Sequence, residues 1–268
     1  MPTALMLSLR PHEAATVAPH LGRAAHAAFL HALTERDAAL SKTLHDLDAV
    51  KPFTVSDLLG ARGGGDGRSV SPNHTYGLRW TGLSSELDEH LRAWAMTPPT
   101  ELDLDGTHFT VESATTDPKV QAWAGSASWN DLIALEQVGR VVPSHHLHIH
   151  FWSPTTFRSS GRSIPVPQPE LVFGSLLDRW NSVAPLALPV EIRRFAAECL
   201  VFGRYSLEAS WLSIFGAGET AFTGRCTYTA TNRDRYYLHV CAALLRLGFF
   251  SGVGAKTSMG FGMMRTGE

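Results

Sequence analysis

The stretch HLHIHFW at residues 146–152 alternates polar and apolar side chains, which is typical of a β-strand with one buried face. A proline-punctuated loop separates it from PELVFGSLLDRWNSV (169–183), which has the apolar spacing of a helix. Two strands, a long helix and a final strand are predicted at RYSLEASWL (204–212), FTGRCTYTA (222–230), RDRYYLHVCAALLRLGFF (233–250) and FGMMR (261–265). This order of elements is the βαββαβ pattern of a ferredoxin-like domain.

The first half of the chain repeats this order. Its segments are TALMLSL (3–9), an apolar-faced helix at 21–33, KPFTV (51–55), TYGLRWTGL (75–83), a helix at 84–96 and a hairpin over 101–115. The run ARGGGDGRS (61–69) is expected to be a mobile, glycine-rich loop. We predict an α+β fold of two tandem ferredoxin-like (βαββαβ, RRM-like) domains, at 1–140 and 141–268, joined near 137–144.

The composition is that of a folded globular protein. Of the 268 residues, 44% are hydrophobic and 18% are charged, and the formal net charge is -2. Three cysteines without close pairing argue against a disulfide framework, and the N-terminus lacks the basic region of a signal peptide. No stretch reaches the roughly 20 apolar residues that span a bilayer. We therefore expect a cytoplasmic protein that does not associate with membranes.

The charges are distributed unevenly along the chain. Residues 1–157 contain 11 basic and 17 acidic side chains, and residues 158–268 contain 12 basic and 8 acidic ones, so the halves carry -6 and +4. The small total excludes a general polycation, but a positive second half is what a phosphate-binding surface requires.

The segment GVGAKTSMGFG (252–262) places four glycines around a Lys-Thr-Ser triplet. It is not a P-loop, because Ala255 precedes Lys256, and it is not a dinucleotide fingerprint, because Thr257 stands where the third glycine is needed. Since glycine has no Cβ, such a loop can approach either another backbone or a phosphate closely. We favour a loop that cradles an anion over a plain turn between the last helix and the last strand.

This glycine loop resembles the signature loop of the RAMP superfamily of CRISPR-associated proteins, and more narrowly that of the Cas6 endoribonucleases, which process precursor CRISPR RNA. Three further segments are similar to the family's first helix, its active-site segment and the opening of its second domain. They are GRAAHAAFLHAL (22–33), LHDLDAVKPFTVSDLLG (44–60) and HIHFWSPTTFRSSGRSIPVPQPELVFGSLLDRWN (148–181).

The resemblance implies metal-independent cleavage of CRISPR repeat RNA to mature guide RNAs, with no cofactor. The ribose 2′-hydroxyl would attack the adjacent phosphate and leave a 2′,3′-cyclic (or 3′) phosphate and a 5′-hydroxyl. The implied partners are precursor and mature CRISPR RNA, and other Cas effector subunits could join them. A monomer and a homodimer are both compatible with the resemblance.

Such a reaction needs a base, an acid and a cation for the charge that develops on the phosphate. The resemblance implies that His45 transfers a proton and that Lys51 stabilises the transition-state charge. His26 and His31 fall at the family positions that carry a further histidine and a tyrosine or histidine. Five residues on a helix correspond to about 140° of rotation, so His26 and His31 are not expected to share one catalytic face.

We predict that RNA binds through the glycine loop and through basic residues of the second half. The loop residues are Gly252, Gly254, Lys256, Thr257, Ser258, Gly260 and Gly262, and the arginines are Arg158, Arg162, Arg193, Arg194, Arg233 and Arg235. Each arginine alone is more often a solvated surface charge. Together they are candidates for holding the phosphates of an RNA stem.

Two alternatives remain open. The first is a non-catalytic RAMP subunit that binds CRISPR RNA within an effector complex, which needs no catalytic histidine. The second is a zinc-dependent hydrolase that uses His146, His148 and His150, which alternate onto one face of the predicted strand. No carboxylate or cysteine is placed to complete that zinc shell, so we favour a polar strand face and predict no metal.

Overall fold

The computed structural model describes residues 1–64, 67–134, 140–214 and 217–267. Contacts within the chain define two compact units, which are Met1–Ser126 with Ser258–Gly260, and Ala127–Thr257 with Phe261–Glu268. The predicted junction at 137–144 falls partly on residues 135–139, which lie outside the described residues. The division at 1–140 and 141–268 therefore stays a prediction.

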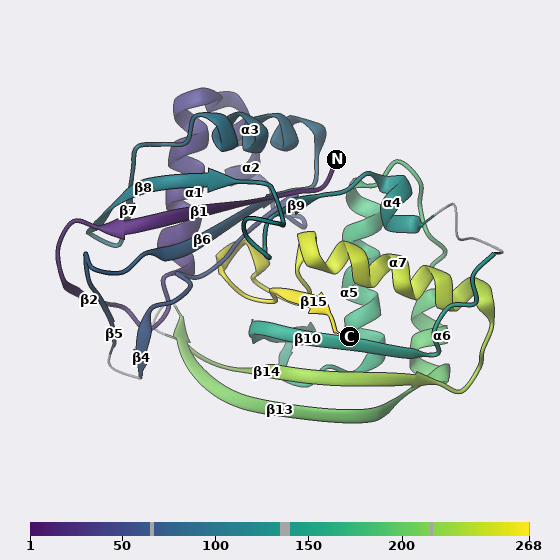
Figure 1. Cartoon of the computed structure of the whole chain (residues 1–268). Helices are drawn as coiled ribbons and strands as arrows, with labels where there is room; N and C mark the ends of the chain where they lie inside the picture. Colours follow the sequence, from purple (N-terminus) through teal and green to yellow (C-terminus); the bar gives the residue numbers. More distant parts are fainter. Residues whose placement is uncertain (65–66, 135–139, 215–216, 268) are drawn as a thin grey trace. The chain divides into compact units, whose positions relative to one another are not determined.

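The first unit is built on an antiparallel sheet with the strand order β3-β6-β1-β8-β7 and with β9 beside β1. Its strands are β1 (Thr3–Pro11), β3 (Phe53–Val55), β6 (Tyr76–Gly82), β7 (Glu101–Leu104), β8 (Thr107–Thr115) and β9 (Gly125–Ser126). Helices α1 (Gly22–Arg36) and α3 (Ser85–Met96) connect these strands in ferredoxin-like order, and α2 (Ala38–Asp46) lengthens the first connection (Figure 1). The βαββαβ prediction for this half is confirmed.

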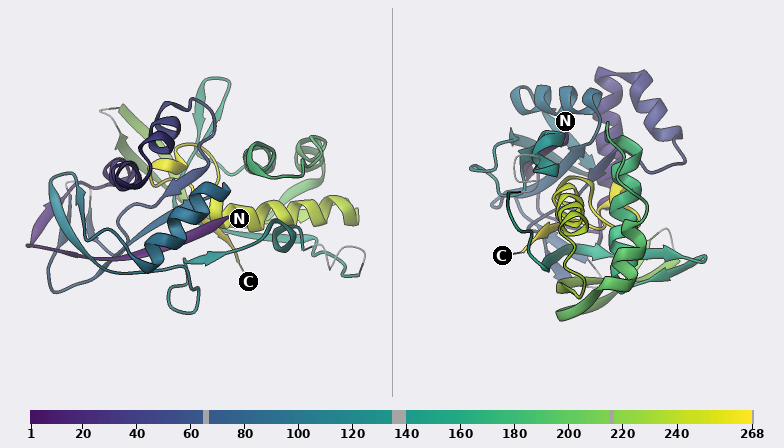
Figure 2. Two further views of the ribbon diagram at one scale, coloured as in Figure 1. Left: turned by 90° about the horizontal axis from the view of Figure 1, so that it is seen from above. Right: turned by 90° about the vertical axis from the view of Figure 1, so that its right-hand side faces the viewer.

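The second unit has an antiparallel sheet with the order β13-β14-β10-β15. Its strands are β10 (His146–Thr155), β13 (Leu200–Ile214), β14 (Ala217–Ala230) and β15 (Met264–Thr266). The two connecting helices, α5 (Pro169–Val183) and α7 (Arg235–Ser251), lie on one side of the sheet (Figure 2, right). Smaller elements complete this unit: α4 (Trp129–Ile133), α6 (Ile192–Cys199), β11 (Phe157–Ser159) and β12 (Arg162–Ile164). The second βαββαβ prediction is also confirmed.

Side-chain periodicity explains why these segments form these elements. Along β10, Leu147, Ile149 and Phe151 are at most 5% exposed, whereas the side chains between them face away from the core. In α1, Ala25, Phe29 and Leu33 are fully buried on one face. Aromatic packing closes the first core, where the ring centroids of Phe29 and Phe53 lie 4.6 Å apart.

The prediction of a loop at 61–69 is wrong for the residues that the structure describes there. The segments β4 (Arg62–Gly64) and β5 (Gly67–Val70) pair as a hairpin, and β5 also pairs with β2 (Ala15–Val17). Arg68 anchors β5, because its guanidinium lies 2.8 Å from a carboxylate oxygen of Asp57. The predicted mobility of residues 65–66 lies outside the described residues.

Within the described ranges, we find no helix with both the length and the apolar character needed to cross a membrane.

Candidate active site

His26 lies on α1 and is held by a backbone carbonyl. Its Nδ1 is 2.8 Å from the carbonyl oxygen of Ser258, and its ring lies 5.4 Å from the ring of Phe53. Partial burial lowers the pKa of His26 below its usual value, against the opposing effect of the Ser258 hydrogen bond, and the charges of Lys51 and His45 lower it further. His26 therefore favours its neutral form near pH 7.

His45 and Lys51 meet at the end of α2. The Lys51 Nζ donates hydrogen bonds to the carbonyl oxygens of Leu44, His45 and Leu47, at 2.5, 3.1 and 2.9 Å. A cation at this position satisfies helix carbonyls that have no partner within the helix. Lys51 thereby fixes the last turn of α2, which carries the exposed imidazole of His45.

The structure brings together three of the four predicted catalytic residues. Lys51 Nζ donates to the His45 carbonyl at 3.1 Å, and the charges of both residues reach the imidazole of His26, so we treat the three residues as one local group. His31 is not part of it. Its side chain is 80% exposed, and its Nε2 lies 3.7 Å from a carboxylate oxygen of Glu35 one helical turn along α1. His26 and His31 thus lie on different faces of the helix.

Part of the glycine loop packs against this group. The segment Ser258–Gly260 belongs to the first unit, and Gly260 forms an isolated parallel bridge with Ser56. A Cβ on Gly22, the first residue of α1, would lie 1.9 Å from the carbonyl oxygen of Met259. Glycine at position 22 is therefore what lets α1 approach the loop, and this approach places the Ser258 carbonyl beside His26.

The other loop glycines serve contacts within the second unit. The N–H of Val253 donates to the carbonyl of Gly262 at 2.9 Å, and Gly252 and Gly262 have φ values of 61° and 69°. Gly254 is held from α5, where its N–H donates to Ser175 Oγ at 2.9 Å and its carbonyl accepts from Arg179 at 2.7 Å. These approaches are to protein groups, and the phosphate cradle stays a prediction.

Lys256 and Arg158, both predicted to bind RNA, converge on a carboxylate. Glu219 of β14 has a side chain that is 5% exposed; it forms an ion pair with Lys256, and its Oε1 lies 3.1 Å from Arg158. Ser163 Oγ donates to the same oxygen at 2.8 Å. Burial raises the pKa of Glu219, but the hydrogen bonds from Lys256 and Ser163 and the positive charges outweigh it and hold the pKa below its usual value. The charge of Lys256 is therefore largely balanced within the protein.

The remaining predicted arginines do not form one cluster, and two of them lie beside acidic side chains. Arg193 is paired with Asp178, and Arg194 lies 3.7 Å from Glu198. Arg233 lies 3.4 Å from the imidazole of His145. Arg162 and Arg235 are exposed, at the start of β12 and of α7. Their contact with RNA stays a prediction.

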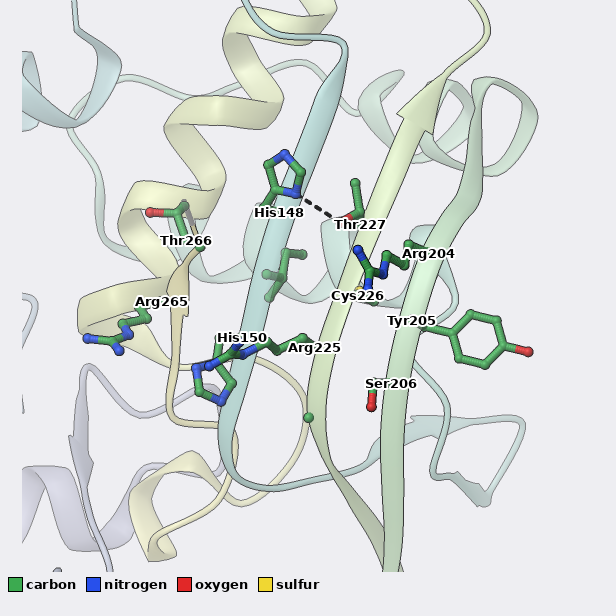
Figure 3. A pocket seen from close by; sticks show the side chains of 13 residues that line it. His148, His150, Arg204, Tyr205, Ser206, Arg225, Cys226, Thr227, Arg265 and Thr266 are labelled. Carbon is green, nitrogen blue, oxygen red and sulfur yellow. Dashed lines mark hydrogen bonds between the residues drawn. The ribbon is translucent and has the colours of Figure 1, made fainter.

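A groove of about 1030 Å³ lies on the face of the second sheet that carries the β10 histidines (Figure 3). The basic side chains along it come from four strands: His148, His150, Arg204, Arg225 and Arg265. None of the residues that the structure places along the groove is acidic. Burial, and then the charges of Arg225 and Arg265, lower the pKa of His150. The permanent positive charge of the groove therefore comes from its three arginines.

These three arginines were not among the residues predicted from the sequence to bind RNA. The only available signal was the alternation of the predicted strands, which places Arg225 on the face opposite Cys226. The register of the sheet then sets Arg225 opposite His150, and Arg265 opposite His150 from the other side. The alternation within one strand does not show which strands are its neighbours, because strand pairing depends on contacts between residues far apart in the sequence.

The same geometry disfavours the zinc alternative. The Nδ1 atoms of His146 and His148 lie 3.1 and 2.8 Å from the hydroxyl oxygens of Thr229 and Thr227. His150 is flanked by two guanidinium groups, which would repel a metal cation. Among the described residues, no group of three or more histidine, cysteine or acidic side chains is arranged to hold a metal ion.

The fold defines an α+β protein of two tandem ferredoxin-like units, with a glycine-rich loop before the last strand. The family model of the CRISPR Cas6 N-terminal domain matches residues 1–134, and that of the CRISPR-associated endoribonuclease Cas6 matches residues 149–264. The chain belongs to the Cas6 family.

Individual relatives agree with this assignment. A CRISPR-associated endoribonuclease Cas6 of Mycobacterium tuberculosis is 32% identical over 119 residues, which cover 44% of this chain and 37% of the relative. The Cas6 of Streptococcus thermophilus is 28% identical over 125 residues, covering 46% of this chain and 51% of the relative. These matches thus span about half or less of the curated relatives.

Solved structures match over nearly the whole chain. A Cas6 product complex superposes with a TM-score of 0.82 at 26% identity, covering 99% of this chain and 100% of the other. The Cas6 of Thermus thermophilus has a TM-score of 0.75 at 25% identity, covering 99% of this chain and 98% of the other. A Cas6-related protein of Pyrococcus furiosus, 12% identical with a TM-score of 0.68, shares the fold.

Proposed function

We propose that this chain is a metal-independent endoribonuclease that cleaves CRISPR repeat RNA into guide RNAs. The observation that carries the proposal is the local group of His26, His45 and Lys51, in which His26 is held by the glycine loop. Family membership and the product and substrate-mimic complexes of similar Cas6 proteins support the choice of RNA substrate. A cytoplasmic location is proposed with it.

His26 is the proposed general base. A carbonyl oxygen can only accept a hydrogen bond, so the contact with Ser258 requires the proton of neutral His26 to be on Nδ1. Its Nε2 then carries a lone pair, and the lowered pKa keeps that lone pair available near pH 7. Nε2 would take the proton of the ribose 2′-hydroxyl as its oxygen bonds to the adjacent phosphorus.

His45 is the proposed general acid. Its side chain is exposed at the end of α2, where its imidazole can exchange protons with solvent and reach a bound RNA. When the bond from phosphorus to the 5′-oxygen breaks, protonated His45 would give its proton to that oxygen. The products would be a 2′,3′-cyclic (or 3′) phosphate and a 5′-hydroxyl.

Lys51 is better explained as a positioning residue than as a direct phosphate ligand. An ammonium group has three N–H donors, and Lys51 directs hydrogen bonds to three carbonyl oxygens at the end of α2. It would orient the turn that carries His45, and its charge would add to the burial that lowers the pKa of His26.

The proposed partners are precursor and mature CRISPR RNA. The groove with Arg204, Arg225 and Arg265 has the charge and the polar lining to bind phosphates of the RNA backbone. Contacts with other Cas effector subunits are also proposed, on the family resemblance alone.

The test is single-turnover cleavage of repeat RNA in EDTA by three histidine variants. His45→Ala and His26→Ala are each expected to slow cleavage about 10²–10⁴-fold, which is the usual contribution of a general acid or base. His31→Ala is the matched control on the same helix, because its side chain is exposed and faces Glu35. It is expected to cleave at the wild-type rate.

Two results would contradict the proposal. Loss of wild-type cleavage in EDTA would exclude a metal-independent reaction. Tight RNA binding with no cleavage by the wild-type chain would instead favour the non-catalytic RAMP subunit.

A further inference from the structure

Asp57 connects the segments that surround the start of α1. One oxygen of its carboxylate accepts hydrogen bonds from the backbone N–H groups of Leu21 and Leu58, at 2.8 and 2.7 Å. The same oxygen lies 2.8 Å from a guanidinium nitrogen of Arg68. The side chains of Asp57 and Arg68 are 16% and 12% exposed, so water and salt screen this ion pair less than a surface pair.

The carboxylate supplies a cap that α1 itself lacks. Leu21 is the residue that precedes the helix, and its side chain has no oxygen to accept from the free N–H groups of the first turn. The first turn of α1 also contains no acidic residue. Asp57 places a negative charge at this end of the helix, where such a charge is favourable. Asp57 therefore fixes the start of α1 from outside the helix.

The backbone at Asp57 contacts the glycine loop. The preceding residue, Ser56, forms the parallel bridge with Gly260. Gly260 has a φ of 86°, and a Cβ at this position would lie 3.0 Å from the backbone nitrogen of Asp57. Asp57 therefore contacts α1 through its side chain and the glycine loop through its backbone.

We propose that Asp57 is a positioning residue that sets the hydrogen bond between His26 and the Ser258 carbonyl. The helix α1 carries the imidazole of this bond and the glycine loop carries its acceptor, and Asp57 contacts both elements. His26 follows Leu21 by little more than one helical turn, so a shift at the capped end reaches its side chain. The inference rests on the proposed function, in which the tautomer selected by Ser258 leaves Nε2 free to act as the base.

Arg68 holds the carboxylate of Asp57 in place. Its guanidinium also donates to the carbonyl oxygens of Leu58 and Ala18, at 3.1 and 3.4 Å. Ala18 precedes α1, and β5, which carries Arg68, pairs with β2 just before it. A guanidinium can direct its N–H groups to several acceptors at once, and a neutral amide has too few donors to replace it. Arg68→Gln should therefore loosen Asp57 without removing its carboxylate.

The test reads the tautomer of His26 in RNA-free protein, at a pH above the pKa of this residue. The NMR chemical shifts of its imidazole nitrogens should show the proton on Nδ1 in the wild type. In Asp57→Ala, part of the population should carry the proton on Nε2. Single-turnover cleavage should then slow about 10–100-fold, whereas RNA affinity should change less than about twofold. Affinity should hold because the arginines of the groove belong to the second unit.

Three further variants separate positioning from a loss of folding. In Asp57→Asn the amide oxygen can still accept from Leu21 and Leu58, so the tautomer and the rate should stay closer to the wild type than in Asp57→Ala. Arg68→Gln should shift both readouts in the same direction as Asp57→Ala, and it keeps the test available if that variant does not fold. Glu89→Ala, at an exposed carboxylate on α3 of the same unit, is the control and should match the wild type.

The tautomer and the rate distinguish failure of this inference from failure of the proposed function. An unchanged Nδ1–H tautomer in folded Asp57→Ala and Arg68→Gln would overturn the inference, even if cleavage slowed. A shifted tautomer with a wild-type cleavage rate would instead support the positioning of His26 by Asp57. It would contradict the assignment of His26 as the general base.

Discussion

At the level of single residues, the state of His26 is set by its partial burial, by one carbonyl oxygen and by the positive charges near it. The Ser258 contact selects the tautomer, and burial together with Lys51 and His45 lowers the pKa. Both effects keep Nε2 unprotonated near neutral pH. Neither could be predicted from the sequence, because Ser258 is 232 positions away from His26.

This arrangement predicts the pH dependence of cleavage. Protonation of His26 removes the base, so the rate should fall as the pH drops through its pKa, below about pH 6.5. Lys51→Gln removes a positive charge that lowers this pKa. The pKa of His26 should therefore rise, and the acidic limb of the rate profile should move to higher pH.

The measurement is a single-turnover rate profile, together with an NMR titration of the His26 imidazole. The titration reads the pKa directly, even if the variant cleaves slowly because α2 has lost its cap. An unchanged or lower pKa of His26 in Lys51→Gln would contradict the electrostatic link between these residues.

At the level of elements, side-chain periodicity predicted the helices and the longer strands. The pairing of strands could not be predicted in this way. The alternation at 146–152 and the apolar helix pattern at 169–183 correspond to β10 and α5. The three-residue strands β2 and β4 were missed, since so short a segment shows no period and depends on a distant partner. The cap that Lys51 provides was missed as well, because the lysine lies five residues beyond the end of α2.

The contact between α1 and the glycine loop can be tested with Gly22→Ala. Replacing glycine by alanine in a helix usually stabilises it, by roughly 0.5–1 kcal/mol. Here the new Cβ would clash with the Met259 carbonyl, so we expect the free energy of unfolding to fall by about 1–3 kcal/mol. Cleavage should slow as well, because the Ser258 carbonyl would be displaced from His26.

Urea unfolding and single-turnover cleavage measure these two effects. Ala27→Ser, at an exposed position on the same helix, is the control and should change stability by less than about 0.7 kcal/mol. A Gly22→Ala variant as stable and as active as the wild type would show that this close approach does not matter.

At the level of the whole molecule, the positive charge of the second half is only partly available to a ligand. The count of +4 was predictable from the sequence, but the fold places the buried Glu219 between Lys256 and Arg158, where it forms ion pairs with both. The arginines of the groove line a surface without acidic residues. Identifying which cations are balanced requires the fold, because the balancing carboxylate lies 37 positions from Lys256.

The salt dependence of RNA binding distinguishes the arginines of the groove from the two cations that pair with Glu219. Arg225→Ala should weaken binding and reduce the magnitude of the slope of log affinity against log salt by about 0.7–0.9, the loss of one phosphate contact. Arg158→Ala should change the slope less, since its guanidinium already lies 3.1 Å from Glu219. Equal slope changes for both variants would contradict this distinction, and circular dichroism would confirm that both are folded.

The central claim is that imidazole groups of the first unit activate a ribose hydroxyl of the RNA itself. A repeat RNA with a single 2′-deoxyribose on the 5′ side of the scissile phosphate tests it most directly, because only the nucleophile is removed. The wild-type chain should bind this RNA as tightly as the unmodified one and leave it uncut. Cleavage of the deoxy-substituted RNA at that phosphate would mean that water or another group is the nucleophile, and would contradict the claim.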